Sequence, residues 1–188
     1  MKHIYKTIQG WFDFHNIYTE AVNTFNSGSK FIEIGTWKGR SAAYMAVEII
    51  NSKKDIKFYC VDTWMGSAEH MKGARFEDLA VVNNVLYDEF LKNIQPISSS
   101  IIPLRMTSLE AAASFEDNTI DFIFIDASHD YKNVKADLAA WYPKLKSTGT
   151  FAGHDYGGKS VRRAVDEFST ESKLTVLCNN TSWVLKSV

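Results

Sequence analysis

The sequence predicts an α/β protein with a Rossmann-like, doubly wound and mostly parallel sheet that carries helices on both faces. Short apolar runs alternate along the chain with segments of helical periodicity, as in sheets built from β-α-β units. The runs are almost continuously apolar, which is typical of strands buried on both faces. The last two runs are separated by a short turn, so they form a hairpin that makes one strand antiparallel.

The first half of the chain shows this alternation clearly. Residues 30–35 form an apolar run that ends in glycine, and residues 40–51 repeat apolar side chains at helical spacing. Residues 56–62 are expected to form a strand because they are rich in aromatic and β-branched side chains. A short strand over residues 101–105 precedes an alanine-rich helix over residues 109–115.

The second half repeats the alternation. Residues 120–126 read Ile-Asp-Phe-Ile-Phe-Ile-Asp, a nearly continuous apolar strand, and residues 132–141 form a helix that ends before Pro143. A strand over residues 150–153 precedes a helix over residues 161–168, which has apolar side chains on one face. The hairpin strands cover residues 174–178 and 183–186, on either side of an Asn-Asn turn.

Two stretches fall outside the plain alternation. Residues 1–25 are rich in aromatic side chains, which predicts an amphipathic cover helix or an oligomer contact. We expect a helical cover segment over residues 1–29, one domain over residues 30–188, and a homodimer that forms through the cover segment. The connection between the second and third strands is longer than one helix requires. It is predicted to hold a helix over residues 77–93 and a mobile segment over residues 63–74 that covers the site.

Composition excludes several classes of function. Apolar residues make up 45% of the 188 residues and the formal net charge is −1, so the basic excess typical of nucleic-acid binding is missing. No apolar run reaches the ~18 residues of a membrane span. The first residues lack a signal-peptide core, and Cys60 and Cys178 are too few for a disulfide scaffold. We therefore expect a cytoplasmic protein that has no nucleic-acid or membrane partner.

The end of the first strand is the first candidate binding site, because ligands of open α/β sheets bind at the carboxyl ends of the strands. The chain continues there as an E-x-G-x-x-x-G pattern that opens a helix. Gly35 and Gly39 allow a tight turn and a close approach to a ligand, whereas Trp37 blocks the pyrophosphate of a nicotinamide cofactor. The Glu33 carboxylate suits a cationic amine, and a solvated strand end is the alternative interpretation.

The second strand ends in another acidic residue. Asp62 lies 23 residues after Gly39, close to the spacing at which an acid holds a ribose diol, and a helix cap is the alternative role. Trp64 follows two residues later. Its ring either stacks on an adenine or packs in the core.

Two further strand ends carry acidic residues and histidines. Asp126 and Asp155 come from neighbouring strand ends, where their carboxylates can hold a hard cation. His154 can join them, although imidazole is a less usual magnesium ligand. His129 follows Asp126 by three residues and is suited to take a proton near neutral pH. Each residue alone also fits a cap or a surface position, but the group of four predicts a site.

The stretch from Gly153 to Ser160 matches another motif. It reads G-x-x-x-x-G-K-S, the pattern of a phosphate-binding loop, so an ATP- or GTP-dependent phosphotransferase is an alternative function. His154, Asp155 and Tyr156 place bulky and anionic groups where phosphates would bind. They favour a glycine-rich turn before a helix.

Taken in order, these segments resemble class I S-adenosylmethionine-dependent methyltransferases. The closer resemblance is to the group that includes macrolide-sugar O-methyltransferases and cephalosporin hydroxylase-like proteins, and it runs from about residue 30 to the C-terminus. It is carried by Glu33-Ile34-Gly35-Thr36 with Gly39 and Ser41, Val61-Asp62-Thr63-Trp64 with Gly66, Ile125-Asp126-Ala127-Ser128-His129-Asp130-Tyr131, Asp137-Leu138 with Trp141 and Pro143, and Gly153-His154-Asp155-Tyr156.

The resemblance implies seven strands, S-adenosylmethionine as the cofactor, and a set of site residues. The cofactor-binding residues that it implies are Glu33, Gly35, Thr36, Gly39, Ser41, Asp62, Thr63, Trp64, Thr107, Ser108 and Asp126. In the metal-dependent members, acids at the positions of Asp126 and Asp155 bind magnesium, and His154 falls where some members have an acidic ligand. His129 matches the position of the general base in the sugar O-methyltransferases.

The resulting hypothesis is methyl transfer to a hydroxyl group of a sugar, a polyketide or a phenol. Magnesium on Asp126 and Asp155 would bind the hydroxyl, His129 would take its proton, and the oxygen would attack the sulfonium methyl group in line. The alternatives are the phosphotransferase, a non-catalytic cofactor-binding protein and a hydroxylase-like enzyme.

Overall fold

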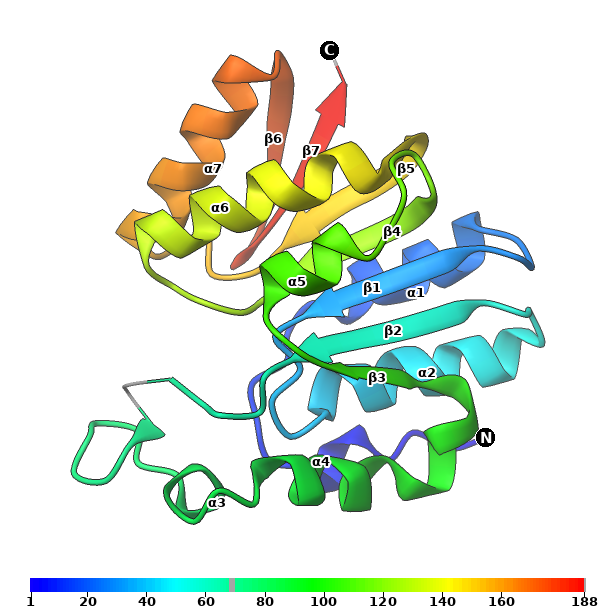
Figure 1. Cartoon of the computed structure of the whole chain (residues 1–188). Helices are drawn as coiled ribbons and strands as arrows, with labels where there is room; N and C mark the ends of the chain where they lie inside the picture. Colours follow the sequence, from blue (N-terminus) through cyan, green and yellow to red (C-terminus); the bar gives the residue numbers. More distant parts are fainter. Residues whose placement is uncertain (68–69, 188) are drawn as a thin grey trace.

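The computed structural model describes residues 1–67 and 70–187. Its seven-stranded sheet has the strand order β3-β2-β1-β4-β5-β7-β6 (Figure 1). Strands β1 to β5 pair in parallel, whereas β7 runs antiparallel to both β5 and β6. The predicted fold class, including the antiparallel strand from the terminal hairpin, is therefore confirmed.

The elements have the following bounds. The strands are β1 (Lys30–Ile34), β2 (Lys57–Asp62), β3 (Ile102–Arg105), β4 (Ile120–Ile125), β5 (Leu145–Gly153), β6 (Leu174–Asn179) and β7 (Ser182–Ser187). The α-helices are α1 (His15–Thr24), α2 (Arg40–Ser52), α3 (Leu79–Val82), α4 (Leu86–Ile94), α5 (Ser108–Ala113), α6 (Tyr131–Trp141) and α7 (Lys159–Glu171). Short 3-10 helices cover Tyr5–Thr7, Gln95–Ser100 and Tyr142–Lys144.

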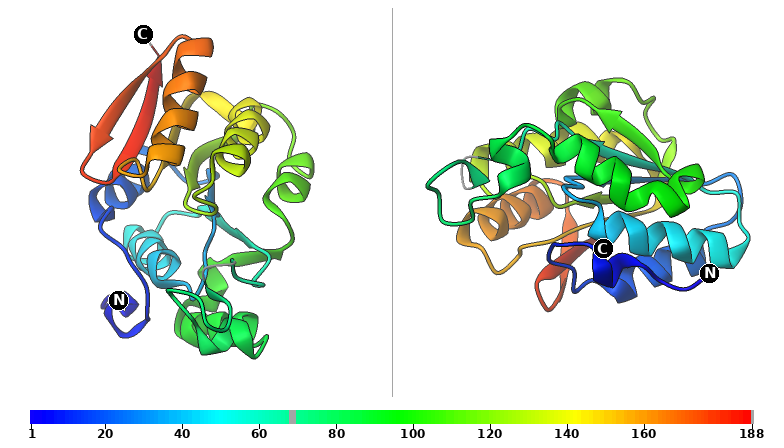
Figure 2. Two further views of the ribbon diagram at one scale, coloured as in Figure 1. Left: turned by 90° about the vertical axis from the view of Figure 1, so that its left-hand side faces the viewer. Right: turned by 90° about the horizontal axis from the view of Figure 1, so that it is seen from below.

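Helices cover both faces of the sheet, with α1 and α2 on one side and α5 and α6 on the other (Figure 2). Alternate residues of each strand supply the two cores, since successive side chains of a strand point to opposite faces. Phe31 and Phe122 pack in the core shared with α1, α2 and α4. Ile32 and Ile123 pack in the core shared with α5, α6 and α7. This double cover explains why all of β4 is buried and apolar apart from Asp121.

The predicted helix over residues 77–93 is wrong, because the structure has two helices there. The Asp78 carboxylate caps α3 by accepting a hydrogen bond from the Ala80 amide (2.8 Å). Asn84 adopts a left-handed φ of 55° between α3 and α4, which ends the first helix before the second begins. Apolar side chains continue through this break, so periodicity alone does not reveal it.

The ends of the chain differ from the expectation in detail. The aromatic N-terminal segment is helical only in the short 3-10 turn and α1, and it packs against α2 and the sheet. Strand β5 begins at Leu145, five residues earlier than predicted. The sequence does not reveal this first half because it is polar, and it pairs with β4 only through Leu145 and Ile120. Residues 68 and 69 of the segment expected over the site, and the final residue 188, lie outside the described residues. None of the helices in the described part of the chain has the length and apolar character needed to cross a membrane.

Candidate active site

The residues that follow β2, β1, β4 and β5 meet at one edge of the sheet. Backbone hydrogen bonds join them: the Gly35 amide donates to Val61 (2.9 Å) and the Asp126 amide donates to Ile34 (2.8 Å). Between β1 and β4 the direction of the strand order reverses, which is where open α/β sheets bind ligands. The edge therefore brings the predicted site residues into one region.

Two glycines shape the turn between β1 and α2. Gly35 has a φ of 86°, and a Cβ atom there would lie 2.1 Å from the Asp126 carbonyl oxygen. Gly39 has a φ of 85°, and its Cβ would approach the Phe90 ring at 3.0 Å. Both glycines are thus required by the protein's own packing as well as by the turn. Trp37 between them takes a left-handed φ of 46°, which is strained for a bulky residue.

The Asp62 carboxylate holds this turn in place. Its Oδ2 accepts hydrogen bonds from the amides of Thr36 (2.9 Å) and Trp37 (2.8 Å), and its Oδ1 accepts one from the Trp64 amide (2.8 Å). Burial raises the pKa of Asp62, and the hydrogen bonds from the backbone amides oppose this increase. The Thr63 amide interacts with the same carboxylate, so the backbone of the two turns occupies most of its acceptor positions.

Trp64 is a core residue in the structure. Its side chain is 1% exposed and packs between Tyr87 and Phe90 of α4, while its Nε1 donates to the Trp37 carbonyl (2.8 Å). The structure therefore favours core packing over adenine stacking for this ring. The hydroxyl of Thr63 accepts a hydrogen bond from the Met65 amide (3.2 Å).

Glu33 is buried beneath the turn, with 1% exposure. Its Oε1 accepts a hydrogen bond from Ser41 Oγ (2.6 Å), whereas its Oε2 has no hydrogen-bond partner. The hydroxyl of Tyr18 from α1 interacts with this carboxylate and lowers its pKa, although no well-formed hydrogen bond joins it to Oε2. Burial raises the pKa of Glu33 to about 8, and the nearby charges of Asp126 and Asp62 add to this effect. A buried carboxyl with an unpaired oxygen is suited to receive a cationic hydrogen-bond donor.

The Glu33→Gln variant is expected to unfold at higher temperature than the wild type at pH 8. The folded-state pKa of about 8 exceeds the ordinary value of 4.5, so the unfolded chain releases this proton first as pH rises. Wild-type stability therefore falls between pH 4.5 and 8, and glutamine removes the cost of ionising this buried carboxyl. Thermal unfolding at pH 5 and pH 8 measures the difference, with the exposed Glu116→Gln as control. Equal pH dependence in both variants contradicts the buried-acid assignment.

Thr107 and Ser108 cap and anchor α5. Thr107 Oγ1 accepts from the Glu110 amide, and Glu110 in turn accepts from the Thr107 amide (3.0 Å), which is a capping box. Ser108 Oγ donates to Asp137 Oδ1 (2.5 Å) and accepts from Trp141 Nε1 (2.9 Å). Burial raises the pKa of Asp137 to about 6. The Thr-x-x-Glu pattern over residues 107–110 is a sequence signature of this capping box, whereas the bonds of Ser108 depend on partners far away in the sequence.

Asp126, His154, Asp155 and His129 form a compact cluster at the same edge. His154 Nδ1 lies 3.4 Å from Asp126 Oδ1 and 3.2 Å from Asp155 Oδ2, and His129 Nε2 lies 2.9 Å from Asp155 Oδ2. Burial opposes the charged His154 ring, but the hydrogen bonds to Asp126 and Asp155 outweigh it and raise the pKa of His154 to about 10. The two histidines outweigh the effect of burial on Asp155 and hold its pKa well below the ordinary value. The expected convergence of these four residues is therefore present.

Two residues that the sequence did not indicate complete this cluster. Asp13 Oδ1 lies 3.0 Å from His154 Nε2, and Thr181 Oγ1 lies 2.9 Å from the same nitrogen. Thr181 Oγ1 also donates to Asp13 Oδ2 (2.7 Å). Asp13 belongs to the N-terminal segment and Thr181 to the hairpin turn, and no local pattern marks either residue.

Lys38 is a further residue that sequence reasoning missed. It lies in the Gly35–Gly39 turn with 4% exposure, and its Nζ lies 2.7 Å from Asp78 Oδ2, 2.9 Å from Gln9 Oε1 and 3.2 Å from Glu89 Oε1. Burial would raise the pKa of Asp78, but the bond from Lys38 keeps it below the ordinary value. One buried cation thus joins the turn to the N-terminal segment, the cap of α3 and helix α4.

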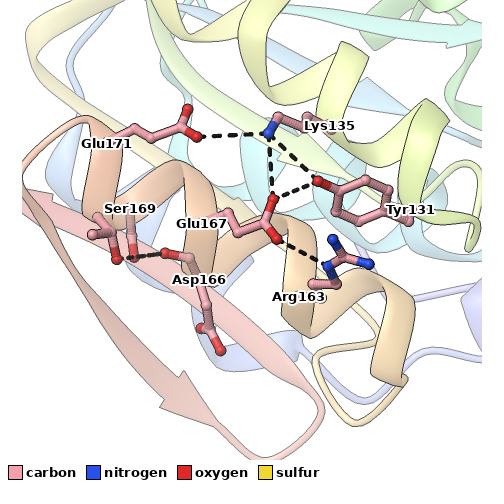
Figure 3. Close-up of polar contacts among 8 residues, drawn as sticks. Tyr131, Lys135, Arg163, Asp166, Glu167, Ser169 and Glu171 are labelled. Carbon is pink, nitrogen blue, oxygen red and sulfur yellow. Dashed lines mark hydrogen bonds and ion pairs between the residues drawn. The ribbon is translucent and has the colours of Figure 1, made fainter.

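A surface network fixes the helix that follows His129. Tyr131 and Lys135 of α6 contact Glu167 of α7, which also accepts from Arg163 Nε (2.9 Å) (Figure 3). Lys135 Nζ lies 3.6 Å from Glu171 as well. Because Tyr131 is two residues after His129, the network helps to place the start of α6 beside the β5–α7 loop.

The β5–α7 loop does not have the arrangement of a phosphate cradle. The backbone amides of His154, Tyr156 and Gly158 donate to carbonyl groups of the protein, at 3.0, 2.8 and 2.8 Å. A phosphate-binding loop needs such amides to point at the phosphates. The geometry therefore favours the interpretation of residues 153–160 as a glycine-rich turn.

Solved structures with the same fold include several methyltransferases. The O-methyltransferase NovP superposes with a TM-score of 0.70 at 14% identity, covering 93% of this chain and 79% of that protein. The calicheamicin methyltransferase CalS11 gives a TM-score of 0.63 at 13% identity, covering 92% and 76%. Fibrillarin from Aeropyrum pernix, solved with natively bound S-adenosyl-L-methionine, gives 0.56 at 11% identity, covering 93% and 76%. At these identities the likeness shows the fold.

Comparison of the sequence with known proteins identifies the protein family to which the chain belongs. An uncharacterized protein, y4gI, from Sinorhizobium fredii is 31% identical over 126 residues, which are 67% of this chain but only 13% of that protein's length. A family described as a methyltransferase domain matches residues 32–156, the part of the chain that holds β1 to β5 and most of the site. On this match, the chain belongs to the methyltransferase-domain family.

Proposed function

We propose that this chain transfers a methyl group from S-adenosylmethionine to a hydroxyl group of a small molecule, such as a sugar, a polyketide or a phenol. The observation that carries the proposal is the position of the His129–Asp155 pair at the same sheet edge as the Gly35–Gly39 turn and Glu33. Membership of the methyltransferase-domain family and the shared fold of two O-methyltransferases, NovP and CalS11, support it.

The cofactor is proposed to bind along the ends of β1, β2 and β4. Glu33 would receive the ammonium group of the methionine part with its buried Oε2, and Asp62 would accept a hydrogen bond from a ribose hydroxyl. The remaining contacts would come from Gly35, Thr36, Gly39, Ser41, Thr63, Thr107, Ser108 and Asp126. Bound S-adenosyl-L-methionine in the fibrillarin of the same fold supports this choice of cofactor.

His129 is proposed as the general base. Its Nε2 donates to Asp155, which fixes the tautomer whose lone pair is on Nδ1. Nδ1 would take the proton of the acceptor hydroxyl while the oxygen attacks the sulfonium methyl carbon. The new carbon–oxygen bond forms as the carbon–sulfur bond breaks, and its electron pair returns to sulfur to give S-adenosylhomocysteine. Alignment of oxygen, carbon and sulfur supplies much of the acceleration.

Magnesium, which the sequence resemblance implies, fits this cluster poorly. Asp126 and Asp155 offer the oxygen ligands that magnesium prefers. The third ligand atom within reach is a ring nitrogen of His154, and nitrogen is a poor ligand for this ion. No step of the proposed reaction is therefore assigned to magnesium.

Calorimetry with S-adenosylhomocysteine tests the cofactor assignment. We expect binding in the micromolar range and none with ATP. Glu33→Gln is expected to weaken binding about tenfold, because a charge-assisted hydrogen bond to the ammonium group is lost. Glu116→Gln serves as the control. ATP binding without binding of S-adenosylhomocysteine would overturn the proposal, and cofactor binding without turnover of any hydroxyl acceptor would indicate a non-catalytic cofactor-binding protein.

A further inference from the structure

Tyr18 of α1 packs on the face of the sheet to which Glu33 points. Glu33 of β1 is in register with Cys60 of β2 and Phe124 of β4, so these three side chains point to one face. On that face the centroid of the Tyr18 ring lies 5.1 Å from that of Phe124 and 5.7 Å from that of Phe122. Helix α1 thus places a phenolic hydroxyl beside the carboxylate at the end of β1.

The Tyr18 hydroxyl and the Glu33 carboxylate interact inside the core, where Tyr18 is fully buried and Glu33 is 1% exposed. Ser41 Oγ donates to Glu33 Oε1 at 2.6 Å, whereas neither Oε2 nor the Tyr18 hydroxyl has a well-formed hydrogen bond. Burial raises the pKa of Glu33, and the hydroxyls of Ser41 and Tyr18 oppose this increase. Buried polar groups without good partners are uncommon and costly, so the pair points to a ligand that completes the arrangement.

We propose that Tyr18 is a positioning residue for the cofactor and acts through Glu33. In the complex, the Tyr18 hydroxyl donates to Oε2 as Ser41 does to Oε1, and the two bonds direct the carboxylate toward the ammonium group of the methionine part. The inference rests on the proposed function, because it assumes that Glu33 receives this ammonium group. Tyr18 lies outside residues 32–156, the part of the chain that the methyltransferase-domain family matches. The N-terminal segment therefore contributes to cofactor affinity.

Calorimetry with two ligands tests the proposal. S-adenosylhomocysteine contains the ammonium group, whereas methylthioadenosine lacks the whole amino-acid part. Tyr18→Phe, which keeps the ring and removes the hydroxyl, is expected to weaken binding of S-adenosylhomocysteine about tenfold and to change binding of methylthioadenosine less than about twofold. In the Glu33→Gln background, Tyr18→Phe is expected to have little further effect on either affinity, because the carboxylate that it positions is gone.

Tyr44→Phe is the matched control. The Tyr44 hydroxyl of α2 lies 2.8 Å from Thr19 Oγ1 of α1, so this variant removes a hydroxyl from the contact between the same two helices. It is expected to leave the affinities for both ligands unchanged. If Tyr44→Phe weakened binding of S-adenosylhomocysteine as much as Tyr18→Phe does, Tyr18 would act only by holding α1 in place, and the proposal would be wrong.

The two ligands also separate a positioning role from a general disturbance of the site. Equal loss of affinity for both ligands in Tyr18→Phe would overturn the proposal. Equal binding of S-adenosylhomocysteine by the wild type and Tyr18→Phe would overturn it as well, while the proposed function would stand. A wild type that does not bind S-adenosylhomocysteine would overturn the proposed function and this role together.

Discussion

The Lys38→Met variant is expected to lose about 3–5 kcal/mol of folding free energy, a large share of the stability of an ordinary domain. Methionine keeps most of the volume of the side chain but removes the charge. Asp78, which is 5% exposed, would then hold a buried carboxylate without its cation, and Gln9 and Glu89 would lose the same partner. Urea denaturation of the variant and the wild type measures the difference.

Two further variants make this prediction specific. The exposed Lys92→Met on α4 is expected to change stability by less than about 0.5 kcal/mol. The double variant with Lys38→Met and Asp78→Asn is expected to recover part of the loss, because it removes the unpaired charge as well as its partner. If Lys38→Met matches Lys92→Met, the buried cation does not hold the turn.

Replacing His129 by Ala is expected to lower kcat for methyl transfer about 100- to 10,000-fold, the usual contribution of a general base. The Asp155 carboxylate loses the ring that it orients at 2.9 Å, but Glu33 and the Gly35–Gly39 turn are unchanged. Affinity for S-adenosylhomocysteine should therefore stay within a factor of two or so. The measurement needs a hydroxyl acceptor that the wild type methylates.

A pH profile distinguishes a base from a structural role. The wild-type kcat should fall at low pH as His129 gains a proton, and this fall should be missing in the Ala variant. His3→Ala, which removes a histidine from the N-terminal surface, is expected to keep both rate and profile. A variant at position 129 with wild-type turnover would exclude His129 as the base.

The sequence predicts much of the fold because the central strands carry a clear signal. The run Ile-Asp-Phe-Ile-Phe-Ile at β4 is apolar almost throughout, and its observed bounds lie within one residue of the prediction. The break between α3 and α4 escaped prediction because it depends on the conformation of Asn84, while the apolar pattern runs through it. The first half of β5 was missed because Lys146, Ser147 and Thr148 look like loop residues.

In the candidate site, the sequence predicts the residues that are marked by a local pattern and misses those whose partners are far away in the sequence. Glu33, Asp62, Asp126 and Asp155 were found because each lies in the last residues of a strand or just after it, and parallel strands end at one edge. Asp13, Lys38 and Thr181 were missed because their roles come from partners far away in the sequence. The contact between Asp13 and His154, for example, spans 141 positions. Trp64 looked equally suited to a ligand or to the core, and only its neighbours Tyr87 and Phe90 decide between them.

The contacts of His154 with Asp13 and Thr181 affect the order in which parts of the chain fold during synthesis on the ribosome. Thr181 is made 168 positions after Asp13. The contact between them spans most of the chain, and such contacts form late because a long loop must close first. His154 therefore reaches its final orientation only after the hairpin that carries Thr181 has folded.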